Sequence, residues 1–216
     1  MQPVRYDRAD LREAVLAALA RTDGTWYGRT LQAAPCGCEL TEEEQRIVLD
    51  GCMQAAAEMA AQLAGSPHAD EPLKLAERLH LRVVHTREEL REPFLYLGLY
   101  EPDTRTITLN DSALTLICAL ITQHGLEGLT PAADVQRLAL YHEIFHALEE
   151  QTPGIYTRSR MLERKSFGLF PSWRGLDGAS EVGAIHFSKC MAGVSYSPCI
   201  YERYLLWALG ISSIDF

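Results

Sequence analysis

Apolar positions in the first third of the chain recur every three or four residues, a spacing that predicts helices. Residues 7–20 place leucine and valine on one stripe, typical of a short amphipathic helix. Residues 41–64 repeat the pattern over a longer stretch, and their opening Thr-Glu-Glu-Glu is a capping box. The intervening segment 24–37 is interrupted by glycine and proline and is expected to be irregular. Gly-Ser-Pro at 65–67 ends the long helix and marks the expected domain boundary.

Short strands are predicted after this boundary. Asp70 is expected to cap a helix over 71–80 that has proline in its first turn. The apolar run 81–85 is strand-like, and its pairing partner is left open. Residues 94–100 and 104–109 predict two antiparallel strands joined through a Glu-Pro-Asp-Thr turn. The pattern therefore predicts one small sheet in this part of the chain.

The remaining pattern is mainly helical. Asp111 is expected to cap one helix, and Thr130 followed by proline opens a second helix that runs to about residue 150. Together these elements predict an α+β fold, mostly helical, in which a small twisted sheet packs on the second of these helices and a further helix crosses close by. The predicted domains are a helical N-terminal appendage over 1–66 and a main domain over 67–216.

The segment 142–146 reads His-Glu-Ile-Phe-His and lies inside the predicted helix that ends near residue 150. Residues four apart share one face of a helix, so the imidazoles of His142 and His146 can reach a single metal ion. Glu143 then lies beside the metal, placed to take a proton from an attacking water. The flanking residues are apolar, as expected for the helix of a buried site. The alternative is a helix with two hydrogen-bonded histidines and a solvated glutamate.

A catalytic zinc site usually takes three protein ligands, so a third ligand must come from another part of the chain. Glu181 is the preferred candidate because it lies in the apolar segment 179–187, where Ser180 is expected to cap the helix. Glu150 continues the spacing from His146, but its carboxylate would lie a further helical turn along. The weaker candidates are Asp177, Glu163 and His186.

Two imidazoles and a carboxylate favour Zn²⁺, although Mn²⁺ and Fe²⁺ accept the same ligands. With His142, His146 and Glu181 as ligands and Glu143 as general base, the motif predicts metal-assisted hydrolysis, foremost of peptide bonds. The transition state of that reaction develops negative charge, which a hydrogen-bond donor should stabilise. Spacing does not choose among the three candidate donors, Tyr156, His186 and Tyr196.

Four blocks of sequence follow one another in an order that carries a family resemblance. A helix and strand are predicted over 72–84, a hairpin from Gly98 ends in Ile-Thr-Leu-Asn, and the His-Glu-x-x-His segment follows. The fourth block, Glu-x-x-Ala-x-x-Phe-Ser, begins at Glu181. Together they resemble the ImmA/IrrE family of small gluzincin-type zinc metallopeptidases. The resemblance implies a metallopeptidase domain over 67–216 and, as substrate, a specific regulatory protein such as a DNA-binding repressor.

Composition narrows the function classes. Of the 216 residues 47% are hydrophobic and 23% charged, as in an ordinary globular protein, and the formal net charge is −9. An acidic chain is not expected to bind the phosphate backbone of nucleic acids directly. The first residues lack the apolar core of a secretory signal and no run reaches the length of a membrane span, so the chain is expected to be cytoplasmic, without membrane contact.

The six cysteines are expected to be reduced thiols, given the predicted compartment. Cys36 and Cys38, with Cys52 downstream, offer a possible soft-metal site, but the second paired motif of a zinc-binding domain is missing. Small core residues are the expected role of the other cysteines.

Residues 151–178 form a connection that is long for the resembled family and is predicted as a loop. It interleaves basic residues with aromatic ones, so it is either a lid that grips an acidic or phosphorylated partner or a loop with buried aromatics and solvated arginines. The residues concerned are Arg158, Arg160, Arg164, Lys165, Arg174, Phe167, Phe170 and Trp173.

Two further readings of the motif stay open beside the peptidase. The first is a non-proteolytic regulatory module that binds a partner protein and uses its metal structurally. Glu143 disfavours that reading, because a structural site needs no carboxylate beside the metal. The second is a hydrolase of some other substrate, for which the sequence offers no sugar or nucleotide signature.

Overall fold

The computed structural model describes residues 3–4, 6–91, 95–166 and 170–211, and for 162–166 and 170–174 the course of the backbone alone. The protein is mostly helical with a small three-stranded mixed sheet and belongs to the α+β class, as predicted. The helices are α1 (Arg8–Leu19), α2 (Asp23–Ala33), the 3₁₀ turn η1 (Gly37–Glu39), α3 (Glu42–Ala64), α4 (Pro72–Arg78), α5 (Asp111–His124), α6 (Ala133–Glu150), α7 (Tyr156–Ser159), α8 (Asp177–Ala192) and α9 (Cys199–Leu209). The strands are β1 (Arg82–Thr86), β2 (Gly98–Glu101), β3 (Thr106–Asn110), β4 (Met161–Ser166) and β5 (Phe170–Gly175).

The two predicted N-terminal helices are confirmed, and each begins at a capping residue. The carboxylate of Asp7 accepts hydrogen bonds from the first backbone N–H groups of α1. At the start of α3 the side chains of Thr41 and Glu44 form the predicted capping box. Each arrangement satisfies backbone donors that have no partner inside the helix.

The prediction of an irregular segment over 24–37 is wrong, because residues 23–33 form α2. The hydroxyl of Thr22 caps this helix, and Trp26, Tyr27 and Leu31 are buried along it. The two glycines lower helix propensity, but burial of these large side chains outweighs that cost. Tertiary packing therefore decides the structure of this segment.

Helix starts differ from the predictions at three positions. Glu71, not Asp70, precedes α4, and Asn110, not Asp111, caps α5 by accepting from the backbone N–H of Ser112. α8 begins at Asp177, so Ser180 lies inside that helix and does not cap it. A residue next to the true boundary carries an equivalent side chain in the first two cases, which is why the spacing alone misplaced the cap.

The three-stranded sheet has the order β1-β3-β2. β2 and β3 pair antiparallel, as predicted, with Tyr100 opposite Ile107. β1 pairs parallel with β3, with Val83 opposite the same Ile107, and this settles the pairing that the sequence left open. β2 is therefore an edge strand, and its free edge lies beside α6.

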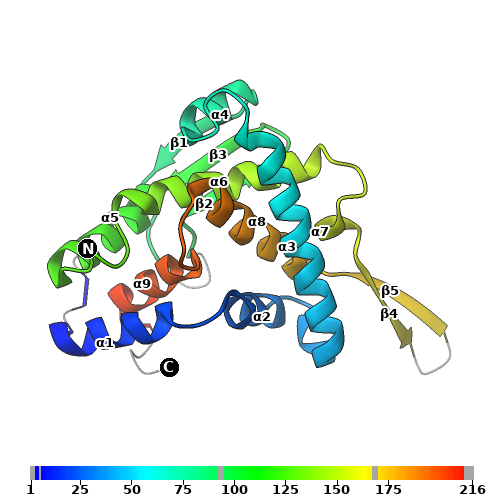
Figure 1. Ribbon diagram of the computed structural model, residues 1–216, viewed down its shortest axis with the longest axis horizontal. Coiled ribbons are helices and arrows are strands. Elements are labelled where there is room, and N and C mark those ends of the chain that lie inside the picture. The colour runs from blue at the N-terminus through cyan, green and yellow to red at the C-terminus, as the bar shows by residue number, and fades with distance from the viewer. Residues whose placement is uncertain (1–2, 5, 92–94, 167–169, 212–216) are drawn as a thin grey trace.

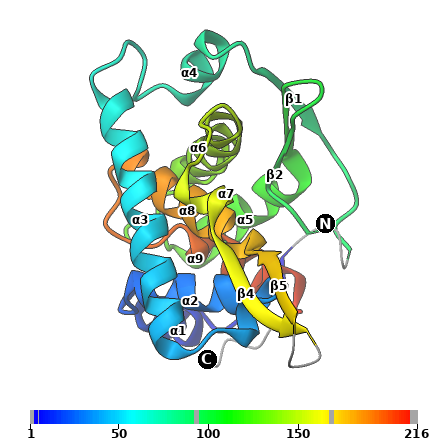
Figure 2. The ribbon, with the colours of Figure 1, turned by 90° about the vertical axis from the view of Figure 1, so that its right-hand side faces the viewer.

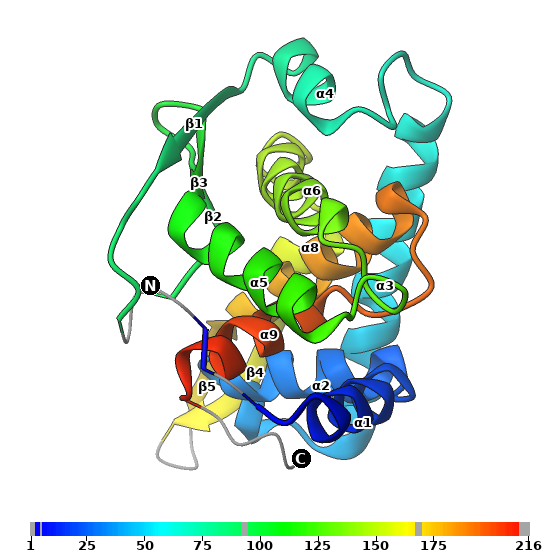
Figure 3. The same cartoon turned by 90° about the vertical axis from the view of Figure 1, so that its left-hand side faces the viewer.

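α6 runs through the middle of the molecule, with the sheet on one side and α8 packed against it (Figure 2). The same helix is seen end-on behind α5 in the opposite view (Figure 3). Gly183 lets α8 approach α6 closely, because a Cβ at this position would meet the ring of Phe145 at 2.8 Å. Because the two helices lie this close, residues on their facing sides can bind the same ion.

α8 is packed between α6 and the N-terminal helices, since α3 and α2 both contact it (Figure 2). Buried residues of α3, such as Val48 and Ala56, belong to the same hydrophobic cluster as those of α6 and α8. The predicted division of the chain after residue 66 stays a prediction.

None of the helices in the described ranges is long and apolar enough to cross a membrane.

The predicted loop over 151–178 is wrong in its secondary structure. It contains α7 and an antiparallel hairpin of β4 and β5, which projects from the body of the molecule (Figure 1). A projecting hairpin needs no strict alternation of apolar and polar residues, so the pattern gave no strand signal. The side chains of Arg164, Lys165, Arg174, Phe167, Phe170, Trp173 and Glu163, on which the basic lid depends, lie outside the described residues.

Candidate metal centre

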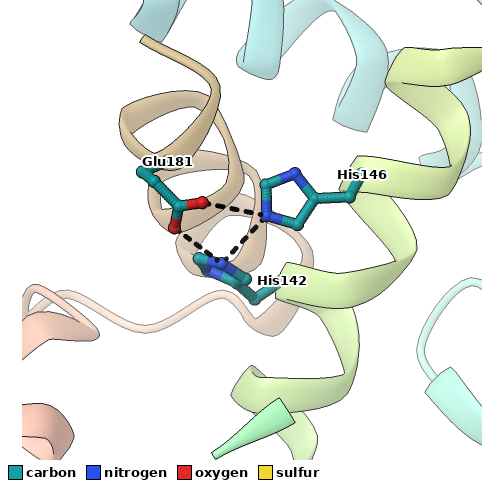
Figure 4. Close-up of side chains that lie close together, drawn as sticks. All are labelled: His142, His146 and Glu181. Atoms are coloured by element: carbon teal, nitrogen blue, oxygen red, sulfur yellow. Dashed lines mark hydrogen bonds and ion pairs between the residues drawn. The ribbon is translucent and has the colours of Figure 1, made fainter. Parts of the chain in front are cut away.

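The structure brings together the three residues predicted as metal ligands. His142 and His146 project from successive turns of α6, and Glu181 faces them from α8 (Figure 4). The two Nε2 atoms lie 3.2 Å apart. The carboxylate oxygens of Glu181 lie 3.3 Å from Nε2 of His142 and 3.6 Å from Nε2 of His146. The three residues form a group that can hold a metal ion.

The three distances fit one particular geometry. Zinc binds imidazole nitrogen and carboxylate oxygen at about 2.0–2.2 Å, so neighbouring ligand atoms of a tetrahedral site are separated by about 3.3–3.6 Å. The separations of 3.2, 3.3 and 3.6 Å lie within about 0.1 Å of this range. The donor atoms are therefore spaced for a single small ion and need little rearrangement to bind it.

The ligands shift each other's ionisation. Burial opposes the charged form of Glu181, but the hydrogen bond and charge of His142, with the charge of His146, lower the pKa of Glu181 to about 2. Burial likewise opposes protonation of His142, yet the hydrogen bond with Glu181 and the charge of Glu143 raise the pKa of His142 to about 9. Strong mutual shifts of this kind are common at functional sites.

Glu143 lies beside the ligands and is held in place on two sides. Its side chain is 6% exposed and packs on Gly98 of β2, where a Cβ would come within 2.8 Å of Cγ of Glu143. The backbone N–H of Tyr100 donates a hydrogen bond to its carboxylate. Burial is the largest cause of a raised pKa of Glu143. A buried carboxylate next to a metal group matches the role of general base.

A hydrogen-bond network behind His146 was missed by sequence reasoning. Its Nδ1 lies 3.2 Å from the hydroxyl of Ser180, which donates to the buried carboxylate of Glu149 at 2.6 Å. Thr157 of α7 donates to the other oxygen of Glu149. When Nε2 of His146 binds a metal, Nδ1 carries the proton and donates it into this network, which fixes the orientation of the ring.

Burial alone would raise the pKa of Glu149, but hydrogen bonds from His146, Ser180 and Thr157 outweigh it and lower this pKa. The carboxylate is therefore charged and available to orient His146. Its spacing, three residues after His146, is a weak signal in the sequence. The contributions of Ser180 and Thr157 have no local signal, because they depend on the packing of α8 and α7.

We expect Glu149→Gln to weaken zinc binding by about 10- to 100-fold, the usual cost of losing such a partner of a ligand histidine. The amide keeps the size of the side chain but carries no charge to support the imidazole. Competition with a zinc chelator of known affinity measures the change. Glu150→Gln, one residue along the helix, is the control and should bind zinc as the wild type does, because Glu150 instead accepts a hydrogen bond from the hydroxyl of Tyr100. Equal zinc affinity in Glu149→Gln and wild type would contradict the orienting role.

Two cavities open on either side of the metal ligands, and His142, Glu143 and Glu181 line both. The first, of about 400 Å³, lies between β2, α6, α8 and α9. The second, of about 600 Å³, extends along β2 toward α7 and the start of α8. A chain that passes over the metal ligands can therefore place neighbouring side chains in two separate spaces.

None of the three predicted oxyanion donors lines either cavity. The Tyr156 hydroxyl donates to the backbone oxygen of Ile47, and His186 pairs with the Tyr27 hydroxyl. Tyr196 donates to Asp134. Of the weaker ligand candidates, Asp177 lines the second cavity, and Glu163 lies outside the residues whose side chains are described.

The cysteines take no part in the metal centre. All six are free, and no cysteine joins a metal-binding group in the described part of the chain. Cys52 is fully buried in α3, and burial, with the charge of Glu149, raises the pKa of its thiol to about 12. A thiol that holds its proton this firmly is a core residue and not a ready metal ligand.

No protein-family model, no curated protein and no solved structure matches this chain. The resemblance to the ImmA/IrrE family therefore stays a prediction.

Proposed function

We propose that the protein is a zinc-dependent hydrolase of peptide bonds. The observation that carries the proposal is the convergence of His142, His146 and Glu181 at tetrahedral spacing with the buried carboxylate of Glu143 beside them. A structural zinc site is normally closed by four protein ligands, whereas three ligands and an adjacent carboxylate are typical of a catalytic one. The gluzincin-like arrangement of the two ligand-bearing helices belongs to this proposal.

The donor set suits zinc, because His142 and His146 offer imidazole nitrogens and Glu181 offers a carboxylate oxygen. When bound, the ion supplies Lewis-acid activation of the attacking water and of the scissile carbonyl. The Glu181 carboxylate offsets part of the ion's charge, and the network from His146 to Glu149 keeps one imidazole in the required tautomer.

Glu143 moves the protons. Its carboxylate accepts a proton from the attacking water and delivers the same proton to the nitrogen of the leaving amine. The contact with Gly98 and the hydrogen bond from Tyr100 hold the carboxylate, so little reorganisation is needed during the reaction.

The free edge of β2 favours a peptide as the substrate. Leu97 accepts a backbone hydrogen bond from Asn110 of β3, so the neighbouring backbone groups of Gly98 point the other way, out of the sheet. An extended peptide can add to such an edge through main-chain hydrogen bonds. Gly98 and Leu99 line the second cavity together with the metal ligands, so a peptide on this edge lies over the site.

A specific regulatory protein, such as a DNA-binding repressor, is the substrate that the family resemblance implies. The proposed setting is the cytoplasm, where a selective peptidase can act on such a protein.

The test is zinc-dependent cleavage of peptides. Zinc-loaded protein should cleave a mixture of blocked hexapeptides, followed by mass spectrometry, and should stop when a chelator removes the metal. Re-addition of zinc should restore the rate, because the residues that bind zinc stay folded around the site. Cleavage that continues at zero zinc content, or a stoichiometrically loaded protein that cleaves neither peptides nor a partner protein, would contradict the proposal.

A further inference from the structure

Metal-assisted hydrolysis does not explain which residues line the first cavity. Its walls are largely apolar and come from α2, β2, α6, α8, α9 and the segment 95–97. The apolar residues that form most of the wall are Leu97, Val135, Leu138, Ile185, Leu205 and Leu206. Besides Glu143 and Glu181, the carboxylate of Glu202 of α9 lines the same space.

Glu202 lies near the metal ligands. Its charge interacts with those of Glu181, His142 and the adjacent Arg203. Across the ranges that the structure describes, no side chain forms a hydrogen bond or an ion pair with it at contact distance. The adjacent Arg203 stacks on the ring of Trp207, with its guanidinium carbon 5.7 Å from the ring centre.

The environment of Glu202 disfavours its charged form. Glu202 is exposed and lines the cavity. Partial burial of its carboxylate, together with the charge of Glu181, raises the pKa of Glu202. Among the described residues that line this cavity there is no lysine or arginine. A positive charge that enters the cavity would therefore form an ion pair with Glu202 and offset its repulsion by Glu181.

We infer that this cavity binds a lysine or arginine side chain that flanks the scissile bond, and that Glu202 determines this specificity. The inference rests on the proposed peptidase function and names the class of its substrates. The long apolar stem of such a side chain packs along Leu138, Ile185 and Leu205, and its charged head reaches Glu202.

Other side chains match the cavity less well. A neutral aliphatic side chain fills the apolar walls but leaves Glu202 without a partner and deprives it of water. An acidic side chain meets the carboxylates of Glu143, Glu181 and Glu202 in one small space. The specificity of a binding site is the difference between the binding free energies of competing ligands. Here the carboxylate of Glu202 provides that difference between lysine and a neutral side chain of the same length.

The experiment compares lysine with norleucine, which has the same stem without the ammonium group. Cleavage of a hexapeptide mixture randomised at both flanking positions first identifies the position that prefers basic residues. Single peptides with lysine, norleucine or glutamate at that position are then compared by kcat/KM on wild type and by dissociation constant on zinc-loaded Glu143→Gln, which does not depend on turnover. Glu202→Gln and Glu202→Lys are made in both backgrounds. Glu58→Gln on α3, which changes the charge equally at an exposed residue that lines neither cavity, is the control.

We expect lysine to be favoured over norleucine by about tenfold, the scale of a partly buried charge pair. Glu202→Gln should abolish this preference, Glu202→Lys should shift it to glutamate, and Glu58→Gln should keep it. Equal binding of lysine and norleucine by wild type would overturn the inference even if no Glu202 variant folds, and so would a lysine preference that survives Glu202→Gln.

The outcomes separate this inference from the proposed function. Preferential binding of the lysine peptide without cleavage would refute the peptidase and support the basic specificity of the cavity. Cleavage without a lysine preference would support the peptidase and refute the specificity. Failure of every peptide to bind would overturn both.

Discussion

Replacement of Glu143 by glutamine is expected to abolish peptide hydrolysis while zinc stays bound. Loss of a general base costs about 10²- to 10⁴-fold in rate. The amide fits the same space against Gly98 and can still accept the hydrogen bond from the N–H of Tyr100, so the site keeps its shape. Turnover of a defined peptide and zinc content by elemental analysis, measured on the same preparations, check both parts of the prediction.

Glu58→Gln serves as the control for this experiment as well, because Glu58 is exposed on α3, contacts Gln54 and lines neither cavity beside the metal ligands. It should cleave at the wild-type rate. A Glu143→Gln variant that also cleaved at the wild-type rate would refute the mechanism. A Glu143→Gln variant that lost both zinc and turnover would show that Glu143 acts on metal binding and not on proton transfer.

The metal ligands could be predicted from the sequence because their geometry is mostly local. The spacing of His142 and His146 fixes their common face once the segment is helical, and the apolar flanks show that this face is buried. Glu181 was identified from its apolar surroundings, which indicated a second buried helix. The structure joins these residues as predicted, although α8 starts earlier than the position of Ser180 suggested.

What the sequence did not predict depends on contacts between distant segments. Ser180, Glu149 and Thr157 come from three helices, and no spacing rule relates them. The parallel pairing of β1 with β3 is likewise a property of the assembled sheet. In the sequence Glu202 is one more acidic residue, and only the packing of α9 against the first cavity gives it a distinct role.

The second large effect is expected from removal of a metal ligand. Wild-type protein should bind one zinc ion per chain, and His142→Ala and Glu181→Ala should each lose it or bind it far more weakly, because two remaining donors cannot hold the ion at tetrahedral spacing. Zinc at 1,000-fold its dissociation constant raises the free energy of unfolding by about 4 kcal/mol. Zinc should therefore raise the melting temperature of wild type and leave that of both variants unchanged.

Asp177→Ala is the matched control, because Asp177 is an acidic residue of the same helix that lines the second cavity and was a weaker ligand candidate. It should retain one zinc ion and the zinc-dependent rise in melting temperature. Loss of zinc in His142→Ala but not in Glu181→Ala would keep the site and assign the third ligand elsewhere. Wild-type protein that takes up no zinc after dialysis against it would refute the metal centre, and with it the peptidase, because Glu143 alone cannot activate water strongly enough to cleave a peptide bond.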